Sequence, residues 1–281
     1  GRPRVTAFNP TMLRLHNIND TECPELAPYR SMRKMSDQLG QGLFVAEGLK
    51  VVTRLLETDF NIHSLLLTQH WFDSLKEKIE KRQESMDVFI TDKKGIEKLT
   101  GFGCFQAIKA VANVPASPDL GALFQSSIPP RFFVAIDGLS SAENVGALVR
   151  SAVGFGAQAI IVGQNSCSPY IRRAVHASMG TVFKIPVFHS SNLTETLDFL
   201  RQKRVRMVAA HPHTDKVALH QANFNQDVCV ILGSEGDGLS EEILACCDDQ
   251  MLIPMAHDTD SLNVASAASV FFYEVMRQRI S

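Results

Sequence analysis

The feature that most constrains the fold is a regular alternation of short apolar segments with helical patterns in the C-terminal half of the chain. The apolar segments are short and rich in Val, Ile, Leu and Ala, which predicts strands. Strands that are apolar on both faces and alternate with helices are typical of a mostly parallel sheet with helices on both faces, an α/β fold. The predicted strands are 132–136, 159–162, 184–188, 205–210, 228–232 and 251–253; the predicted helices are 144–155, 170–179, 193–203, a short one from Ser240, and a long final helix.

The rest of the chain divides into three parts. Residues 1–29 contain prolines and little periodicity, which predicts an extended N-terminal arm. Residues 30–113 again alternate strands and helices and predict a small α/β sandwich, whose last strand runs from 105 to 111. Residues 114–130 are rich in Pro, Ser and Gly and predict a linker to a second domain at 131–281. Two domains also agree with the length of 281 residues.

Composition limits the class of protein. Hydrophobic residues make up 45% of the chain and charged residues 21%, as in ordinary globular proteins. No apolar run reaches the roughly 20 residues that span a bilayer, so we expect no membrane segment and a cytoplasmic protein. Because the chain begins with Gly1 and not Met, the sequence does not say whether a targeting segment was removed.

The cysteines and histidines give little support to a metal centre. The six cysteines form no C-x-x-C motif, and several lie in apolar strand-like segments. Free buried thiols in a reducing compartment are therefore favoured over disulfides or zinc. His211, His213 and Asp215 would suit a metal hydrolase, but they lie in a polar loop with no evident further ligand, and we expect no metal.

Positive charge is clustered although the formal net charge is −2. Such clusters are usually solvated surface, and contact with RNA is the alternative interpretation. The clusters are Arg30 with Arg33 and Lys34, Arg172 with Arg173, and Lys203 with Arg204 and Arg206.

The first polar loop follows the strand at 132–136 and leads into a helix. Asn144 can cap this helix, Gly146 permits close packing, and Arg150 lies six residues beyond Asn144. Arg150 is either a solvent-facing residue of an amphipathic helix or a cation directed across the strand ends at a substrate. In the second case it would stabilise developing negative charge.

The second polar loop, GSEGDGL, directly follows the strand at 228–232. Its glycines allow a tight turn and the approach of backbone to a ligand. The loop lacks both the Lys-Ser/Thr ending of a phosphate-binding loop and the glycine order of the dinucleotide fingerprint, so a nucleotide-phosphate site is not expected. Glu235 is either a turn residue or a functional carboxylate.

The third polar loop follows the strand at 251–253, which Pro254 stops, and leads into the final helix. Ser261 stands where an N-cap is expected, and Asn263 follows in the first turn. Small residues at 265–269 leave room for a ligand beside the helix N-terminus. The helix is apolar over so much of its circumference that we expect one side to face the sheet and the other a partner subunit. The two apolar stripes are Val264, Ala267, Ala268 and Phe271, and Phe272, Val275 and Met276.

Together the three loops closely resemble, in order and spacing, the three motifs of the SpoU (TrmH-like) branch of the SPOUT methyltransferases. The matching elements are Asn144 with Gly146 and Arg150, then GSEGDGL, then IPM with SLNVASAAS. The segment 168–187 resembles the family's middle segment, and the resemblance covers residues 131–279. Residues 30–113 are similar to the small ribosomal-protein-like substrate-binding domain that often precedes it. The family more often has Ser-Val where this chain has Ala265 and Ser266.

The resemblance implies several further properties. These are a C-terminal trefoil knot, an exception to unknotted topology, a homodimer with the knot region at its interface, and S-adenosylmethionine as cofactor. By motif match, the adenosine site would be lined by Gly233, Ile253 and Leu262. Arg150 would activate a ribose hydroxyl. The residues that hold this Arg, the ribose and the helix terminus would be Asn144, Glu235, Ser261 and Asn263.

The sequence therefore predicts an S-adenosylmethionine-dependent RNA 2′-O-ribose methyltransferase. Ribosomal RNA is preferred to transfer RNA as substrate because of the front domain, a family analogy, and rRNA processing is the expected role. The predicted RNA-binding residues are Arg30, Arg33, Lys34, Arg172 and Arg173. Two alternatives stay open. One is methylation of a base nitrogen, against which the SLN and GSEG patterns speak, and the other is a knotted RNA-binding or assembly factor without catalysis.

Overall fold

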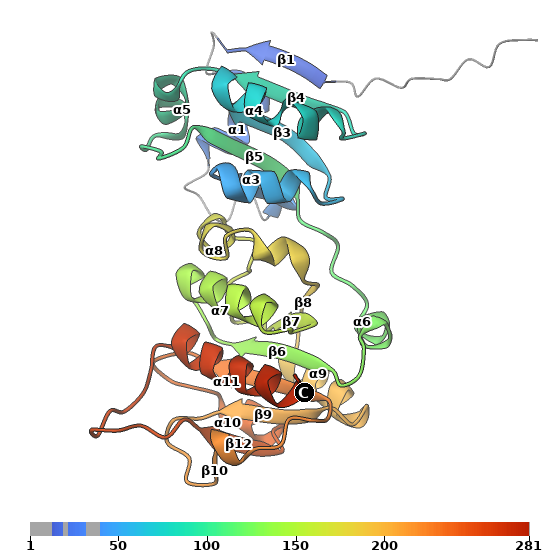
Figure 1. Cartoon of the computed structure of the whole chain (residues 1–281), viewed down its shortest axis with the longest axis vertical. Helices are drawn as coiled ribbons and strands as arrows, with labels where there is room; N and C mark the ends of the chain where they lie inside the picture. The colour runs from blue at the N-terminus through green and yellow to red at the C-terminus, as the bar shows by residue number, and fades with distance from the viewer. Residues whose placement is uncertain (1–12, 19–21, 32–39, 281) are drawn as a thin grey trace, which may run out of the picture. The chain divides into compact units, whose positions relative to one another are not determined.

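The computed structural model describes residues 13–18, 22–31 and 40–280 and divides the chain into two compact units, 1–115 and 116–281 (Figure 1). The predicted linker is not featureless, since it contains helix α6 (Leu120–Ser126). Asp119 caps this helix by accepting a hydrogen bond from the backbone N–H of Ala122 (3.0 Å). Leu123 packs into the core of the second unit. Apolar residues at helical spacing behind a capping Asp therefore place α6 in the second unit.

The first unit is built on a five-stranded mixed sheet in the order β1-β4-β3-β5-β2. Strands β1, β4 and β3 are parallel, and β5 is antiparallel to both β3 and β2. The strands are β1 (Leu13–Asn17), β2 (Leu43–Glu47), β3 (Ile62–Leu67), β4 (Met86–Ile90) and β5 (Ile108–Asn113). The helices are η1 (Pro24–Leu26), α1 (Ala27–Arg30), α3 (Leu49–Leu56), α4 (Gln69–Glu80) and α5 (Lys93–Thr100).

The described part of the predicted N-terminal arm belongs to this unit. Strand β1 adds to the edge of the sheet beside β4, where Arg14 forms an ion pair with Asp87 (2.8 Å). Leu26 and Tyr29 are fully buried, and the Tyr29 hydroxyl is hydrogen-bonded to Ser64 (2.7 Å). The prediction of an extended arm is therefore wrong for residues 13–17, because they pair with β4 as an edge strand. It is also wrong for residues 22–29, because Leu26 and Tyr29 fill a core that the sequence pattern did not reveal.

The last strand of the first unit begins later than predicted, at Ile108 instead of Phe105. Helix α5 ends at Gly101, which adopts a left-handed conformation (φ 78°). A loop of residues 101–107 follows before the strand.

The second unit is built on a seven-stranded sheet in the order β10-β12-β9-β11-β6-β7-β8, and all of its strand pairs are parallel. The strands are β6 (Phe132–Asp137), β7 (Ala159–Val162), β8 (Val187–His189), β9 (Arg206–Ala210), β10 (Val217–Ala218), β11 (Val228–Gly233) and β12 (Asp249–Leu252). The parallel sheet agrees with the prediction from sequence, although the two-residue strand β10 was not foreseen.

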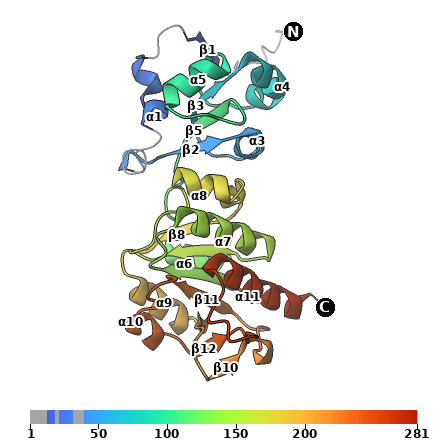
Figure 2. The ribbon, with the colours of Figure 1, turned by 90° about the vertical axis from the view of Figure 1, so that its left-hand side faces the viewer.

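Helices cover both faces of this sheet, as Figure 2 shows. One layer contains α7 (Ala142–Gly154), α8 (Arg172–Ala177) and α11 (Val264–Arg279), and the other contains α6, α9 (Leu193–Gln202) and α10 (Glu241–Ala245). Two 3-10 turns, η2 (Thr181–Lys184) and η3 (Leu219–Gln221), complete the unit. No helix in the described ranges is long and apolar enough to cross a membrane.

Both predicted apolar stripes of α11 turn inward. The buried residues are Val264, Ala268, Phe271, Phe272 and Val275, and Phe272 packs edge-on against Phe132 of β6 (5.6 Å between ring centroids). The expectation that one whole stripe faces a partner is therefore wrong, because both stripes contribute buried residues, although Ala267 and Met276 are only half-buried. Val270 and Tyr273, on a third face of the helix, are 40% and 49% exposed.

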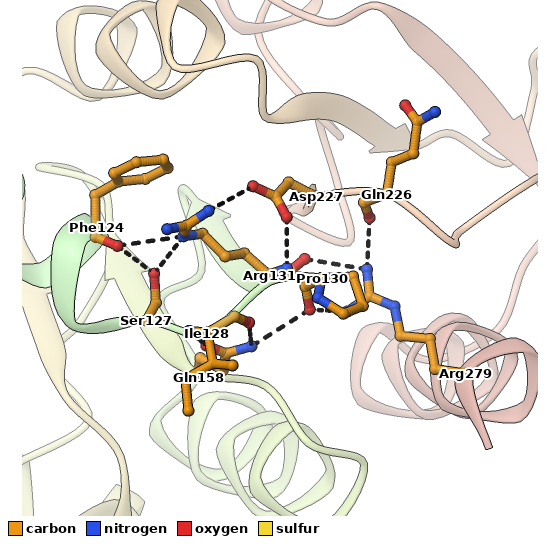
Figure 3. Close-up of polar contacts among 9 residues, drawn as sticks. All are labelled: Phe124, Ser127, Ile128, Pro130, Arg131, Gln158, Gln226, Asp227 and Arg279. Carbon is orange, nitrogen blue, oxygen red and sulfur yellow. Dashed lines mark hydrogen bonds and ion pairs between the residues drawn. The ribbon is translucent and has the colours of Figure 1, made fainter.

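The C-terminal end of α11 is fastened to the amino-terminal edge of the sheet (Figure 3). The Arg279 guanidinium donates hydrogen bonds to the carbonyl oxygens of Pro130 (2.7 Å), Arg131 (3.0 Å), Gln226 (2.6 Å) and Phe224 (2.8 Å). Beside it, Arg131 forms an ion pair with Asp227 (3.0 Å). Burial lowers the pKa of Arg279 below its ordinary value. These contacts hold the start of β6, the start of β11 and the end of α11 together.

Candidate functional site

The three polar loops meet at the carboxyl ends of neighbouring strands of the second unit. The first loop joins β6 to α7, the second follows β11, and the third leads from β12 to α11. Strand β11 lies between β6 and β9, and β12 follows β9. Ligands of open parallel sheets bind at this edge, so the arrangement brings the sequence-predicted residues to the expected place.

Asn263, and not Ser261, caps helix α11. Its side-chain oxygen accepts hydrogen bonds from the backbone N–H groups of Ala265 (2.9 Å) and Ser266 (3.3 Å). Ser261 is exposed and makes no cap, because the helix begins only at Val264. The cap predicted from sequence is therefore displaced by two residues.

The Asn263 amide also ties the three loops together. Its Nδ2 donates to the side-chain oxygen of Asn144 (3.1 Å) and to Oε1 of Glu235 (2.8 Å). The same Glu235 oxygen accepts a hydrogen bond from the backbone N–H of Val264 (3.2 Å). The Glu235 carboxylate thus sits at the N-terminus of α11, where the helix dipole favours negative charge.

Asn144 is not the cap of α7 that the sequence predicted. Ser141 caps this helix, and its hydroxyl accepts a hydrogen bond from the backbone N–H of Asn144 (3.2 Å). Asn144 lies in the first turn, and its side-chain oxygen accepts from Asn263. Two residues on, a Cβ at Gly146 would lie 2.6 Å from that of Ala177, so the glycine lets α8 pack directly on α7.

A pocket of about 210 Å³ opens beside this cluster. It is lined by residues of all three strand ends β9, β11 and β12 and of the start of α11: Ala210, His211, Pro212, His213, Leu232, Gly233, Ser234, Glu235, Gly236, Asp237, Gly238, Leu239, Met251, Ile253, Met255, Asp260, Ser261, Leu262, Val264, Ala267 and Phe271. Three of these residues are acidic and none is Lys or Arg. The pocket therefore favours a ligand that combines apolar surface with positive charge.

The three residues predicted to line an adenosine site, Gly233, Ile253 and Leu262, all line this pocket. Gly233 has a structural reason of its own to be glycine. A Cβ there would lie 2.6 Å from the backbone nitrogen of Leu239, because residues 234–238 fold back in a tight turn closed by a bridge between Ser234 and Gly238.

Arg150 does not line the pocket. Its side chain is exposed on α7 and makes no hydrogen bond or ion pair with a residue in the described ranges. Six residues of helix separate it from Asn144, which places it about 9 Å further along the helix axis. A flexible exposed guanidinium at this distance is available to a bound substrate, although the structure does not direct it at the cluster.

The predicted RNA-binding residues fall into three groups. Arg173 is 63% exposed and lies 3.9 Å from Glu143, and Arg172 beside it on α8 is half-buried. Arg30 donates a hydrogen bond to the carbonyl oxygen of Cys23 (2.9 Å), a contact that stabilises the first unit. Arg33 and Lys34 lie outside the described residues.

The sequence did not predict that Asp237, Asp260, His211 and His213 line one pocket. Their common signal is that each follows the carboxyl end of a strand, which was visible only once the strand order was known. Within the described ranges, no group of three or more His, Cys, Asp and Glu side chains is placed to hold a metal ion. All six cysteines are described, and all are free.

A comparison with family models decides the class of the protein. Residues 131–273 match the SpoU rRNA methylase family, which is half of the chain and includes every loop of the site. The chain belongs to this family of RNA methyltransferases.

Relatives and solved structures extend the likeness to the whole chain. An uncharacterized tRNA/rRNA methyltransferase from Mycobacterium bovis is 28% identical over 96% of this chain and 95% of its own length. Among solved structures, an AdoMet-bound rRNA methyltransferase from Sinorhizobium meliloti is 25% identical in sequence to this chain and superposes with a TM-score of 0.80. The match covers 95% of this chain and 99% of the Sinorhizobium chain. The SpoU methyltransferase AviRb from Streptomyces viridochromogenes shares the fold, with 24% identity, 92% and 99% coverage and a TM-score of 0.79.

Proposed function

We propose that the protein transfers the methyl group of S-adenosylmethionine to a ribose 2′-hydroxyl of RNA, with ribosomal RNA as the substrate. The observation that carries the proposal is the hydrogen-bonded cluster of Asn144, Glu235 and Asn263 beside the acidic pocket. Each residue comes from a different SpoU motif, and the hydrogen bonds among the three residues bring the three motifs together.

The pocket suits this cofactor chemically. S-adenosylmethionine carries a cationic sulfonium and a cationic amino group on an adenosine with a broad apolar face. The carboxylates of Glu235, Asp237 and Asp260 can balance the positive charge, and Ile253 and Leu262 offer apolar surface to the adenine. The relative from Sinorhizobium meliloti, crystallised with AdoMet, supports the assignment.

The chain's own residues would position the acceptor. A ribose hydroxyl is a weak nucleophile at neutral pH, so it must be held in line for attack and pass its proton to water or to an RNA phosphate as the reaction proceeds. The side-chain amide nitrogen of Asn144 makes no hydrogen bond with a described residue and can orient the ribose, while Asn263 and Glu235 hold Asn144 in place. Arg150 would approach the 2′-oxygen from α7 and stabilise the negative charge that develops there.

The proposal includes a homodimer and a C-terminal trefoil knot. Val270 and Tyr273 form an exposed apolar face on α11, and Tyr273 packs edge-on against Phe155 (5.9 Å between ring centroids). This face fits a twofold partner, which would bring a second RNA-binding surface to each site. The knot is proposed from membership of the SpoU family, whose model matches residues 131–273 and so includes β12, the loop 253–263 and most of α11.

The test of the proposed function is to incubate the purified full chain with ribosomal RNA and radiolabelled S-adenosylmethionine and then digest the RNA to nucleosides. We expect label in a 2′-O-methylnucleoside, and mapping of ribose methylation in cells with and without the gene should identify the position. Label in a base-methylated nucleoside would overturn the ribose assignment. In a parallel incubation with transfer RNA, label in transfer RNA and none in ribosomal RNA would overturn the choice of RNA. RNA binding without methyl transfer would favour an assembly factor.

A further inference from the structure

The loop of residues 101–107 in the first unit displays an aromatic side chain in solvent. Phe105 is 96% exposed, the largest exposed fraction among the large hydrophobic residues that the structure describes as exposed. A single exposed apolar residue needs no special explanation. The residues on both sides of Phe105, however, are anchored by hydrogen bonds with the side chain pointing outward.

Hydrogen bonds anchor the loop on both sides of Phe105. The backbone N–H of Cys104 donates to Glu97 of α5 (3.1 Å), and the side chain of Gln106 accepts from the backbone N–H of Leu49 at the start of α3 (2.8 Å). The carbonyl of Ala107 accepts from the backbone N–H of Thr68 (3.2 Å). The loop is therefore fixed to three helices or their caps.

The space beneath the loop is already filled. Phe102 and Cys104 pack against the core of the first unit, and the ammonium of Lys109 lies 5.0 Å from the centre of the Phe102 ring. The two phenylalanines of the loop therefore point in opposite directions, Phe102 toward the core and Phe105 toward solvent. A loop whose backbone is already anchored has little backbone freedom to lose when its exposed ring binds a flat partner.

The surroundings of the loop are basic and aromatic. Helix α5, which leads into the loop, carries Lys94 and Lys98 one turn apart; both are exposed, and neither has an ion pair with a described residue. Helix α4 begins beside Ala107 with His70, which is exposed, and Trp71 in edge contact (4.7 Å between ring centroids). Exposed cations and aromatic rings are the side chains that bind single-stranded nucleic acid, and both kinds occur on the helices joined to this loop.

We propose that Phe105 stacks on an unpaired base of the RNA substrate while Lys94 and Lys98 contact its phosphates. This inference rests on the proposed function and specifies its substrate class: an RNA with an exposed base in a loop, bulge or single strand. A base inside a continuous duplex is already stacked on both faces and cannot be reached by a side chain in this way.

The test uses the full chain and two fluorescent RNAs, a hairpin with an unpaired loop and the same strand annealed to its complement. Phe105→Ala should weaken binding to the hairpin about tenfold, within the range of base–aromatic stacking, and leave duplex binding unchanged. Phe105→Trp should restore hairpin binding. Ile128→Ala, which removes another exposed apolar side chain (74%), is the control and should change neither affinity.

Charge is tested separately. Lys94→Glu combined with Lys98→Glu should weaken binding of both RNAs and reduce the slope of affinity against salt concentration, since phosphate contacts release counterions.

The stacking role would be overturned if wild type and Phe105→Ala bound the hairpin with equal affinity. Methyl transfer by the wild-type chain would in that case still support the proposed function. An equal loss on the duplex would also overturn the stacking role, because stacking requires an unpaired base. If the wild-type chain binds the hairpin through Phe105 but transfers no methyl group, the proposed function is contradicted and the stacking role is not.

Discussion

At the scale of single residues, the site depends on the side-chain amide of Asn263, whose oxygen and nitrogen both form hydrogen bonds. Asn263 accepts with its oxygen to cap α11 and donates with its nitrogen to Asn144 and Glu235. Asp, Ser and Thr also make good N-caps, but ionised Asp has no donor and Ser and Thr have one hydroxyl hydrogen each, so none of them can cap the helix and donate to both Asn144 and Glu235. The second requirement selects Asn.

Replacement of Asn263 separates these two roles. Asn263→Ala should lower the free energy of unfolding by about 1 kcal/mol through loss of the cap and should also weaken cofactor binding. Asn263→Asp should keep the cap but place a carboxylate 2.8 Å from Glu235, so cofactor affinity should change while the helix is retained. Ser261→Ala is the control for the cap and should leave stability unaltered. Urea denaturation and titration calorimetry measure the two effects, and an Ala variant as stable as wild type would contradict the cap.

Arg150 should act on the reaction and not on the fold. Because the side chain is exposed and unpaired within the described residues, Arg150→Ala should leave the thermal midpoint and cofactor affinity nearly unchanged. Turnover should fall by about 10²–10³-fold, as for loss of a charge contact in the transition state. Arg173→Ala, also on the exposed surface, should instead raise the KM for RNA. Near wild-type turnover of Arg150→Ala would remove this residue from the mechanism.

At the scale of elements, the position of the site follows from how helices pack on the sheet. Helix α7 contacts both α8 and α11, and Ser151 and Ser269 are hydrogen-bonded across the second contact (2.8 Å). Small residues where α7 meets α8 and α11 let these helices pack closely, which keeps Asn144 and Asn263 within hydrogen-bonding distance. The sequence showed the small residues but not which helix each of them faces.

Two glycines of α7 should therefore respond in opposite ways. Gly146→Ala brings a Cβ to 2.6 Å from Ala177 and should lower stability by about 1–3 kcal/mol, a typical result of overpacking. Gly154→Ala meets no atom within 4 Å and should raise stability by up to about 1 kcal/mol. Thermal and urea denaturation compare the variants, and a harmless Gly146→Ala would show that α8 can shift without cost.

The far end of α11 provides a second comparison within one element. Arg279→Ala would remove the guanidinium donor from four carbonyl oxygens, of which Arg131 keeps the N–H of Val228 and Pro130 keeps the amide of Gln158. The loss at the carbonyls of Phe224 and Gln226 should still lower the free energy of unfolding by about 2 kcal/mol. Arg277→Ala removes only an exposed contact with Glu274, which solvent screens, and should lower the free energy of unfolding far less than Arg279→Ala. Similar losses for both variants would mean that the contacts in Figure 3 contribute little to stability.

At the scale of the whole molecule, the two units have different tasks in the proposed function. The second unit carries the pocket and the residues of the reaction, and the first carries the surface around Phe105. The described part of the first unit also encloses Arg30 in its own contacts, so this residue is a weaker candidate for RNA binding than the sequence suggested.

Assembly is the prediction that belongs to this scale. Light scattering of the full chain should give about twice the 31.0 kDa chain mass, as for a C₂ dimer. Val270→Glu combined with Tyr273→Glu should yield monomers, because it places charges on the exposed face of α11. A wild-type monomer that methylates RNA would exclude the dimer from the mechanism.

The sequence by itself determined the parallel sheet, the three loops and the family. Strands such as 228–232 are apolar on every residue, and a strand of that kind has to be covered on both faces. The loop residues could be recognised because their types and spacing follow each strand directly. The cap of α10 was equally local, since Ser240 accepts from the N–H of Ile243 (3.3 Å) three residues on.

Only the tertiary structure decided which partners these residues have. Asn263 and Asn144 are separated by 119 residues, and nothing local distinguishes Asn263 from Ser261 as the cap. The inward stripes of α11, the addition of β1 to the first sheet and the outward Phe105 depend likewise on what occupies the neighbouring space. Such choices are set by the competition between distant segments for the same core and the same hydrogen bonds, and a local pattern contains no record of that competition.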